Sequence, residues 1–146
     1  MTSLTLAQAS VIVDEALKYG RARNMKPLTV AVLDAGGYLV AFKREDKSGL
    51  LRREIAEGKA WGVLGMGYGG REFARRNAIR PTFYTALAVA SNGRIMPVIG
   101  GVLIRDQAGE IVGAVGVSGD TEDNDDACAI AGIVAAQFKA DNGDPA

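Results

Sequence analysis

The sequence predicts one α+β domain, in which helices flank a mostly antiparallel β-sheet. Residues 28–44 and 98–118 each have the pattern of a β-hairpin, with two runs of aliphatic residues around a short turn. Segments with apolar residues at spacings of three and four, typical of helices, lie before, between and after these hairpins. The chain has 146 residues, 48% of them hydrophobic, so a single domain over residues 1–146 can bury a substantial core. The order helix, hairpin, helices, hairpin, helix is typical of the α+β class.

The first helix is expected to begin after Thr5 and to continue to about Arg23. Thr5 and Gln8 have the spacing of a capping box, in which each side chain accepts a hydrogen bond from the other residue's backbone amide. Basic residues near the far end suit the negative end of the helix dipole. One face is expected to be buried, formed by Leu6, Ala9, Val13, Ala16, Leu17 and Gly20.

The first hairpin is expected to pair residues 28–34 with residues 38–44 around a glycine-containing turn at residues 35–37. Both faces of the segment 29–33 are apolar, a pattern typical of a strand that is covered from two sides. We therefore expect this strand near the centre of the sheet.

Helices are expected in the middle of the chain. One begins at Ser48 or Gly49 and continues to Gly65 or beyond. A further helical or irregular segment, residues 71–87, is interrupted by Pro81.

Glycines in this region match a dinucleotide-binding pattern, G-x-G-x-x-G, over residues 65–70. That site needs a strand before the glycines and an acidic residue about 20 positions later, and this chain has neither. We interpret residues 65–70 as a glycine-rich helix end. The glycines at 58, 62 and 65 also give the preceding helix a flat face, which permits close packing, including packing between subunits.

The second hairpin turns at residues 106–109 and is punctuated by five glycines, which mark bends or a close backbone approach. The last helix is expected over residues 122–138, and residues 142–146 form a polar tail. Its buried face is expected to contain Ala127, Ile130, Ala131, Val134 and Phe138.

Composition excludes several classes of function. The chain has 17 basic and 17 acidic residues, so a nucleic-acid-binding surface is not expected. It has no apolar run of about 18 residues and no secretory signal pattern, so neither a membrane partner nor export is expected. A lone cysteine cannot form an internal disulfide, and a cytoplasmic location is the default. The lack of histidine excludes most metal and triad chemistries, and we expect no metal site.

Acidic residues gather at the start of the last helix: Asp120, Glu122, Asp123, Asp125 and Asp126. They do not match a calcium-binding loop. We interpret them as a solvated first turn that suits the helix dipole, with Asp120 or Thr121 as the N-cap. The alternative that Asp125 and Asp126 point into a cleft stays open. Cys128 lies beyond this turn, where upstream carboxylates oppose thiolate formation, so we expect a buried, inert thiol.

The exit from the second hairpin is a candidate site for a small anionic ligand, because a helix N-terminus presents free amides there. Hydrolysis without a metal or a histidine needs a carboxylate base and positively charged groups that hold the substrate. The candidate catalytic residues are Asp34 or Asp125 as base, Arg44 as part of a guanidinium clamp, and Ser118 as a hydrogen-bond donor. The candidate substrate-binding residues are Arg52, Lys59, Gly119 and Tyr84.

Five motifs together resemble the GlcG/HbpS-like family over about residues 4–140: VLDAGG at 32–37, FKRED at 42–46, GKA at 58–60, PVIGG at 97–101 and GAVGVSG at 113–119. The resemblance implies a profilin-like fold and homo-oligomers, often large ones. It implies haem binding or haem degradation, an accessory role in glycolate or diol metabolism or, in one branch, hydrolytic dehalogenation of a chlorinated hydroxymuconate. Asp34, Arg44, Lys59 and residues 118–125 match the family pattern.

Three functions follow from these observations. We favour a cofactor-independent hydrolase, possibly dehalogenating, for a small unsaturated carboxylic acid. The second is a haem-binding or haem-degrading accessory protein, with haem in an apolar groove between subunits and its propionates paired to Arg52 or Arg71. The third is a non-catalytic oligomeric binding module. Without histidine, the candidate iron ligands are Cys128, the four methionines, Tyr19, Tyr38, Tyr68 and Tyr84.

Overall fold

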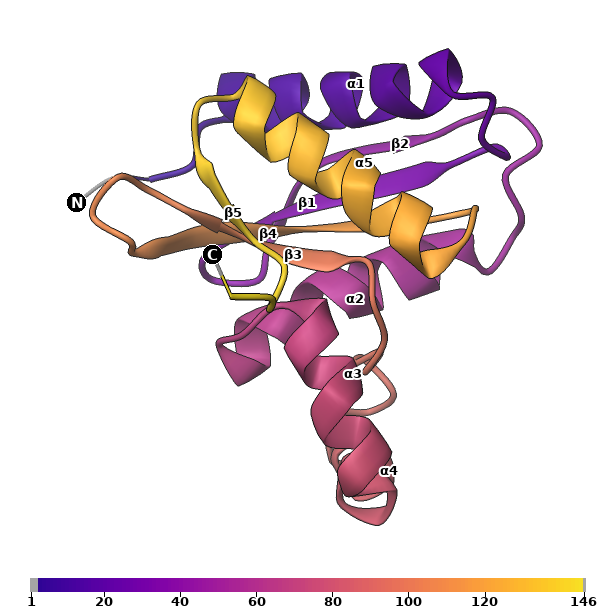
Figure 1. Ribbon diagram of the computed structural model, residues 1–146, viewed down its shortest axis with the longest axis vertical. Helices are drawn as coiled ribbons and strands as arrows, with labels where there is room; N and C mark the ends of the chain where they lie inside the picture. The colour runs from indigo at the N-terminus through magenta and orange to yellow at the C-terminus, as the bar shows by residue number, and fades with distance from the viewer. Residues whose placement is uncertain (1–2, 146) are drawn as a thin grey trace.

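The computed structural model describes residues 3–145 and contains one five-stranded antiparallel sheet with the strand order β2-β1-β4-β3-β5. Figure 1 shows α1 and α5 on one face of this sheet and α2 on the other, while α3 and α4 extend away from it. The elements are α1 (Leu6–Ala22), β1 (Thr29–Asp34), β2 (Leu39–Arg44), α2 (Arg52–Met66), α3 (Gly70–Ile79), α4 (Pro81–Ala90), β3 (Gly101–Arg105), β4 (Ile111–Ser118), α5 (Glu122–Ala135) and β5 (Lys139–Asp141). The predicted α+β class is confirmed.

The capping box of the first helix is present. The Thr5 hydroxyl accepts a hydrogen bond from the backbone amide of Gln8 at 3.1 Å, and the Gln8 side chain accepts one from the Thr5 amide at 3.0 Å. The buried face of α1 differs from the prediction at its start, since Leu6 is 65% exposed. Ile12 contributes to the buried face, which consists of Ala9, Ile12, Val13, Ala16 and Gly20.

Both predicted hairpins form, as β1–β2 and β3–β4. The first strand of the first hairpin, β1, also pairs with the last strand of the second, β4. β1 lies between β2 and β4, so the prediction of a central strand is correct. Its register with β4 places Thr29 opposite Ser118 and Val32 opposite Val115. This pairing brings the start of the first hairpin to the exit of the second, where the anion site was expected.

The sheet separates two hydrophobic cores. The larger lies between the sheet and the α1–α5 pair and includes Ile12, Val32 and Ile133. The smaller lies on the α2 side, around the wholly buried Phe73, where Tyr68 and Tyr84 pack edge-on against its ring. Within residues 3–145, none of the helices combines the length and hydrophobicity required to span a bilayer.

Two helix boundaries differ from the prediction, and one strand was not predicted. α2 begins at Arg52, because residues 48 and 49 have no regular structure and residues 50 and 51 form a turn. α5 ends at Ala135, and Gln137 has a positive φ of 67°, which helix geometry excludes. After this break the chain continues as β5 beside β3, in residues 139–141, which lie between the predicted last helix and the predicted tail and had been assigned to neither.

The predicted buried face of α5 is only partly correct. Val134 is 59% exposed, whereas Phe138, beyond the end of the helix, is buried and Ile130 packs against the larger core. The buried residues of the helix itself are Asp125, Asp126, Cys128, Ala129, Gly132 and Ile133. Apolar residues occur on all sides of α5 itself, so their spacing alone does not determine which face is buried. Gly132 decides the orientation, because any Cβ there would overlap the Ile12 carbonyl oxygen of α1.

Close packing of α2 on the sheet predicts strong intolerance at Gly116. A Cβ at this position would overlap the carbonyl oxygen of Ala56 in α2, so Gly116→Ala should lower the free energy of unfolding by about 1–3 kcal/mol. Gly65→Ala is the control, because a Cβ there meets no atom within 4 Å and should stabilise the helix by up to about 1 kcal/mol. Urea unfolding of both variants measures the difference, and equal stabilities would contradict this account of the packing.

Candidate functional site

The predicted anion-binding corner is filled by a buried ion pair. Lys59 extends from α2 to the end of the sheet, where its Nζ donates a hydrogen bond to the Val117 carbonyl at 2.9 Å. The same Nζ lies 3.3 Å from Oδ2 of Asp125 in α5, and the two side chains are only 4% and 2% exposed. Gly100 makes room for this ammonium group, because a Cβ there would lie 2.6 Å from Nζ.

The amides expected to bind a ligand already have partners. Oδ1 of Asp125 accepts a hydrogen bond from the Asp120 amide at 3.0 Å, and the Thr121 side chain caps α5 by accepting one from the Asn124 amide at 3.2 Å. Gly119 has a φ of 150° and packs so closely against the Pro27 carbonyl that a side chain would overlap it. The corner therefore has the character of a structural junction.

Five of the eight predicted site residues meet at this junction: Arg52, Lys59, Ser118, Gly119 and Asp125. Arg52 donates a hydrogen bond through Nη1 to Oγ of Ser118 at 3.1 Å, and Ser118 is fully buried. These residues lie together as expected, but few of their polar groups are exposed, because they form hydrogen bonds and an ion pair with one another.

The structure does not bring the other three predicted residues to the junction. Asp34 accepts hydrogen bonds from the Gly36 and Tyr38 amides, at 3.0 Å each, and so stabilises the turn of the first hairpin at the opposite end of β1. Arg44 is exposed and donates to the Ser48 carbonyl at 2.8 Å. Tyr84 lies in the smaller core, 3.1 Å from the Tyr68 hydroxyl.

Burial controls the protonation of this region. Desolvation lowers the pKa of Lys59 and raises that of Asp125, while the attraction between the two groups opposes both shifts. Burial, reinforced by Asp125 and Asp120, raises the pKa of the Cys128 thiol to about 12. Its Sγ lies in the core, 3.4 Å from Sδ of Met25, so the expectation of an inert thiol agrees with the structure.

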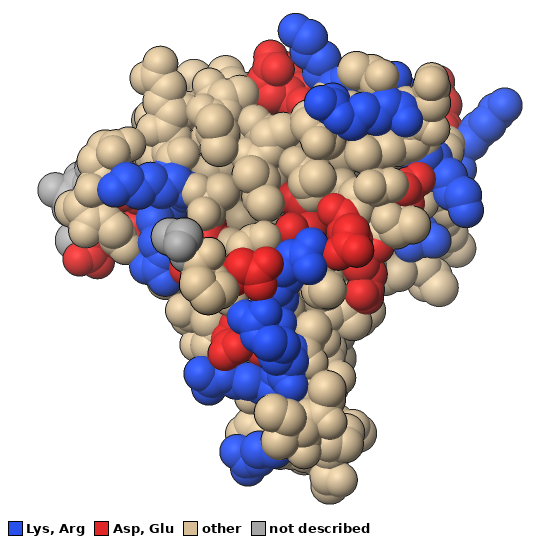
Figure 2. All heavy atoms as spheres, in the orientation of Figure 1, with Lys and Arg blue, Asp and Glu red and all other residues tan. Residues whose placement is uncertain are grey.

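The acidic turn of α5 is only partly solvated, contrary to our interpretation. Asp126 is buried and accepts hydrogen bonds through Oδ2 from Arg71 of α3 at 3.2 Å and from Asn142 at 3.0 Å. Arg71 also contacts the exposed Asp123 at 2.8 Å. Figure 2 shows acidic and basic side chains close together where α3 meets the start of α5. Among residues 3–145, no three potential ligands cluster in a way that could hold a metal ion.

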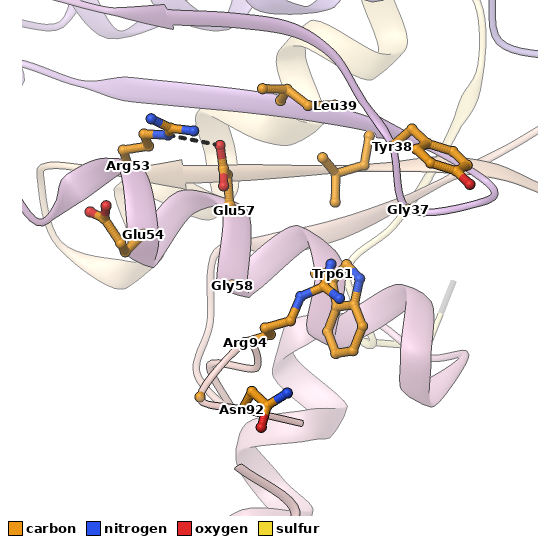
Figure 3. A pocket seen from close by; sticks show the side chains of 12 residues that line it. Gly37, Tyr38, Leu39, Arg53, Glu54, Glu57, Gly58, Trp61, Asn92 and Arg94 are labelled. Atoms are coloured by element: carbon orange, nitrogen blue, oxygen red, sulfur yellow. Dashed lines mark hydrogen bonds and ion pairs between the residues drawn. The ribbon is translucent and has the colours of Figure 1, made fainter. Parts of the chain in front are cut away.

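An open cavity of about 480 Å³ lies elsewhere, between the turn of the first hairpin, the outer face of α2 and the loop after α4. Figure 3 shows the indole of Trp61 and the guanidinium of Arg94 side by side at its wall. The Arg94 Cζ lies 3.9 Å from the Trp61 ring centroid. Tyr38 and Leu39 line the opposite side, from the hairpin, and are 73% and 46% exposed.

The lining of this cavity carries both positive and negative charges. Arg53 pairs with Glu57 at 3.1 Å along α2, and Glu54 is exposed beside them. Gly58 allows residues 94–96 to pack closely on α2, because a Cβ there would lie 2.8 Å from Cγ of Met96. The cavity therefore combines apolar side chains with charged groups of both signs, and it presents one exposed phenol.

Sequence reasoning missed this cavity. The sequence patterns assigned no ligand-binding role to Trp61 or to Arg94, which lies 33 positions later in the chain. The available signals were a tryptophan within three residues of Gly58 and a tyrosine directly after the hairpin glycines. Neither signal indicates that Asn92, Gly93 and Arg94 complete the wall.

Comparison with known proteins gives one consistent result. A family model described as haem-degrading protein HbpS-like matches residues 4–134. Among solved structures, HbpS is 27% identical, with 92% of this chain and 90% of that chain covered and a TM-score of 0.79. Protein ORFY of Klebsiella pneumoniae is 26% identical, with 94% and 93% covered and a TM-score of 0.82. The complex of PduOC with haem shares the fold at 22% identity, with 94% and 97% covered and a TM-score of 0.83.

A search of curated proteins finds no significant match.

The buried pair predicts strong coupling between Lys59 and Asp125. Either Lys59→Met or Asp125→Leu leaves one buried charge unpaired and should lower the free energy of unfolding by about 3–5 kcal/mol. The double variant should recover most of this loss, because no unpaired charge remains. Urea unfolding of the four proteins measures the coupling, and additive losses would contradict the pairing.

Proposed function

Because the chain belongs to the family of HbpS-like haem-degrading proteins, we propose that it binds haem in the cavity formed by the first hairpin, α2 and the loop after α4. The observation that supports this most directly is the combination of an exposed tyrosine, an indole and two guanidinium groups around one opening. A relative with this fold was crystallised with haem, which is consistent with the proposal.

The residues present fit an iron porphyrin. Tyrosine is one of the few side chains that hold haem iron in proteins, and Tyr38 is the tyrosine at this cavity. The hydroxyl groups of Tyr68 and Tyr84 form a hydrogen bond with each other, and the ring of Tyr19 lies beneath the Arg23 guanidinium. Tyr38 is therefore our candidate axial ligand.

The sulfur donors are less suitable. Cys128 and Met25 contact each other inside the core, and Met96 packs against Gly58 behind the cavity. Met66 lies at the end of α2 beside the smaller core, and Met1 lies outside the described residues. Among these candidate iron ligands, the phenol of Tyr38 is the one that is both exposed and at the cavity.

Arg53 and Arg94 are the groups that we assign to the haem propionates, since both line the opening and a guanidinium binds carboxylates in a fork. They replace the earlier candidates Arg52 and Arg71, neither of which lines this cavity. Trp61 and Leu39 supply the apolar walls. Bound haem would supply an iron centre that takes small ligands and changes oxidation state.

This proposal replaces hydrolysis of a small carboxylic acid as our preferred function. The hydrolase hypothesis needs a free base and free amides, but Asp125 is paired with Lys59 and also accepts the Asp120 amide. The family and the structural neighbours also favour the haem alternative over dehalogenation.

Titration with haemin tests the function. We expect a Soret band that saturates at one haem per chain, and weaker binding with an altered visible spectrum for Tyr38→Phe, which lacks the phenolate ligand. Tyr19→Phe is the matched control and should behave like the unmodified protein, because Tyr19 lies on α1 beneath Arg23. If haemin gives no saturable band, the function is wrong. If both variants match the unmodified protein, Tyr38 is not the ligand.

The propionate assignment predicts a second result. Arg94→Leu should weaken haemin binding about tenfold, equivalent to about 1.4 kcal/mol, through loss of a charged hydrogen bond. Arg23→Leu is the control, since that guanidinium also lies over an aromatic ring, 3.4 Å from the Tyr19 centroid, but away from the cavity lining. Equal affinities in the two variants would remove Arg94 from the site.

A further inference from the structure

The two hairpins of the sheet are closed by turns with the same hydrogen bonds. Oδ1 of Asp34 accepts bonds from the amides two and four residues later, at 3.0 Å each, and Oδ1 of Asp106 accepts the equivalent bonds at 3.0 and 2.9 Å. The backbone amide of each aspartate also donates to the carbonyl four residues later, at 2.9 Å in both turns. The glycines three residues after the aspartates, Gly37 and Gly109, have φ values of 85° and 86°. The second turn therefore shows what this turn geometry requires in a place without Tyr38.

The two turns differ at the residue two positions after the aspartate, which is Gly36 in the first turn and Ala108 in the second. Ala108 shows that the turn accepts a methyl group at this position, and the φ of Gly36 is not in the left-handed region. The space beside Gly36 is instead occupied by the ring of Tyr38. A Cβ on Gly36 would lie 3.1 Å from Cε2 and 3.2 Å from Cδ2 of that ring, closer than the roughly 3.5–4.0 Å of an ordinary contact.

The first turn is also fitted to the cavity. A Cβ on Gly37 would lie 3.2 Å from Nε1 of Trp61, whereas one on Gly109 would meet no atom within 4 Å. Figure 3 shows Tyr38 on the turn that holds Gly37. The lining of the cavity includes Gly37 and Tyr38 but none of residues 106–110. The same turn thus closes both hairpins, and in the first one it also carries the phenol and contacts the indole.

From this comparison we propose that Asp34 and Gly36 are positioning residues for the phenol of Tyr38, an inference that rests on the proposed haem site. Asp34 holds the backbone of Tyr38 through both its amide and its carbonyl, and Gly36 leaves the space in which the ring lies. Tyr38 is 73% exposed, so neighbouring side chains constrain its ring little and the turn determines its direction. A ligand that is already oriented loses less conformational entropy when it binds iron.

Titration with haemin and two readouts tests the role of Gly36. Quenching of the fluorescence of Trp61, the single tryptophan of the chain, measures occupancy, and the visible spectrum reports whether a phenolate is bound to the iron. For Gly36→Ala we expect saturable quenching with a spectrum shifted towards that of Tyr38→Phe, because the added methyl displaces the ring. Ala108→Gly is the matched control in the equivalent turn and should keep the unmodified spectrum.

The two aspartates give a second matched pair. Asp34→Ala and Asp106→Ala each remove the same two hydrogen bonds and should lower the urea midpoint by similar amounts. Asp34→Ala alone should change the visible spectrum and weaken haemin binding, by about fivefold for the loss of an ordering hydrogen bond. Asp34→Asn keeps an oxygen acceptor at the same place and should recover the unmodified spectrum.

The outcomes separate the positioning roles from the function. If haemin neither quenches Trp61 nor gives a saturable Soret band with the unmodified protein, the function is wrong and the positioning roles are wrong with it. If haemin binds and Gly36→Ala or Asp34→Ala keeps the unmodified spectrum, that residue does not position the ligand, while the function stands. Asp106→Ala changing the spectrum as much as Asp34→Ala, or Tyr38→Phe leaving it unchanged, would also overturn the proposal.

Discussion

The ion pair between Lys59 and Asp125 joins the two faces of the sheet. Lys59 belongs to α2 on one face and Asp125 to α5 on the other, and they meet beside Gly100 at the end of the sheet. Burying both charges is costly in isolation, so the pair depends on hydrogen bonds from the Asp120 amide and to the Val117 carbonyl. The same pair fixes the N-terminus of α5 and consumes the groups that would otherwise make that corner a binding site.

Sequence patterns with local causes were predictive. The capping box at Thr5 and the two hairpins depend on residues a few positions apart, and these features formed as expected. The face of α5 depends instead on contact between Gly132 and Ile12, which are 120 positions apart, and the apolar spacing of the helix predicted that face only in part. Strand β5 escaped prediction for a similar reason, because three residues become a strand only when β3 is beside them.

The site shows the same division between local and distant causes. Residue types at the exit of the second hairpin predicted an anion site there, and five of the eight predicted residues do lie together at that corner. The burial of Asp125 and Asp126 could not be inferred from their spacing in an acidic turn. The cavity is assembled from the hairpin, α2 and the loop after α4, so its members have no common motif. Tyr38 and Arg94 become neighbours of Trp61 only after the chain has folded.

The borders of the sheet limit how copies of this chain can associate. On one side β5 is only three residues long, so it offers little unpaired backbone to an incoming strand. On the other side β2 ends in Lys43 and Arg44, and Lys43 pairs with Asp14 at 2.7 Å. Cationic side chains at a border discourage open-ended strand addition, the route to fibrous aggregates. The short β5 and the cationic end of β2 therefore both disfavour growth of the sheet by addition of further strands.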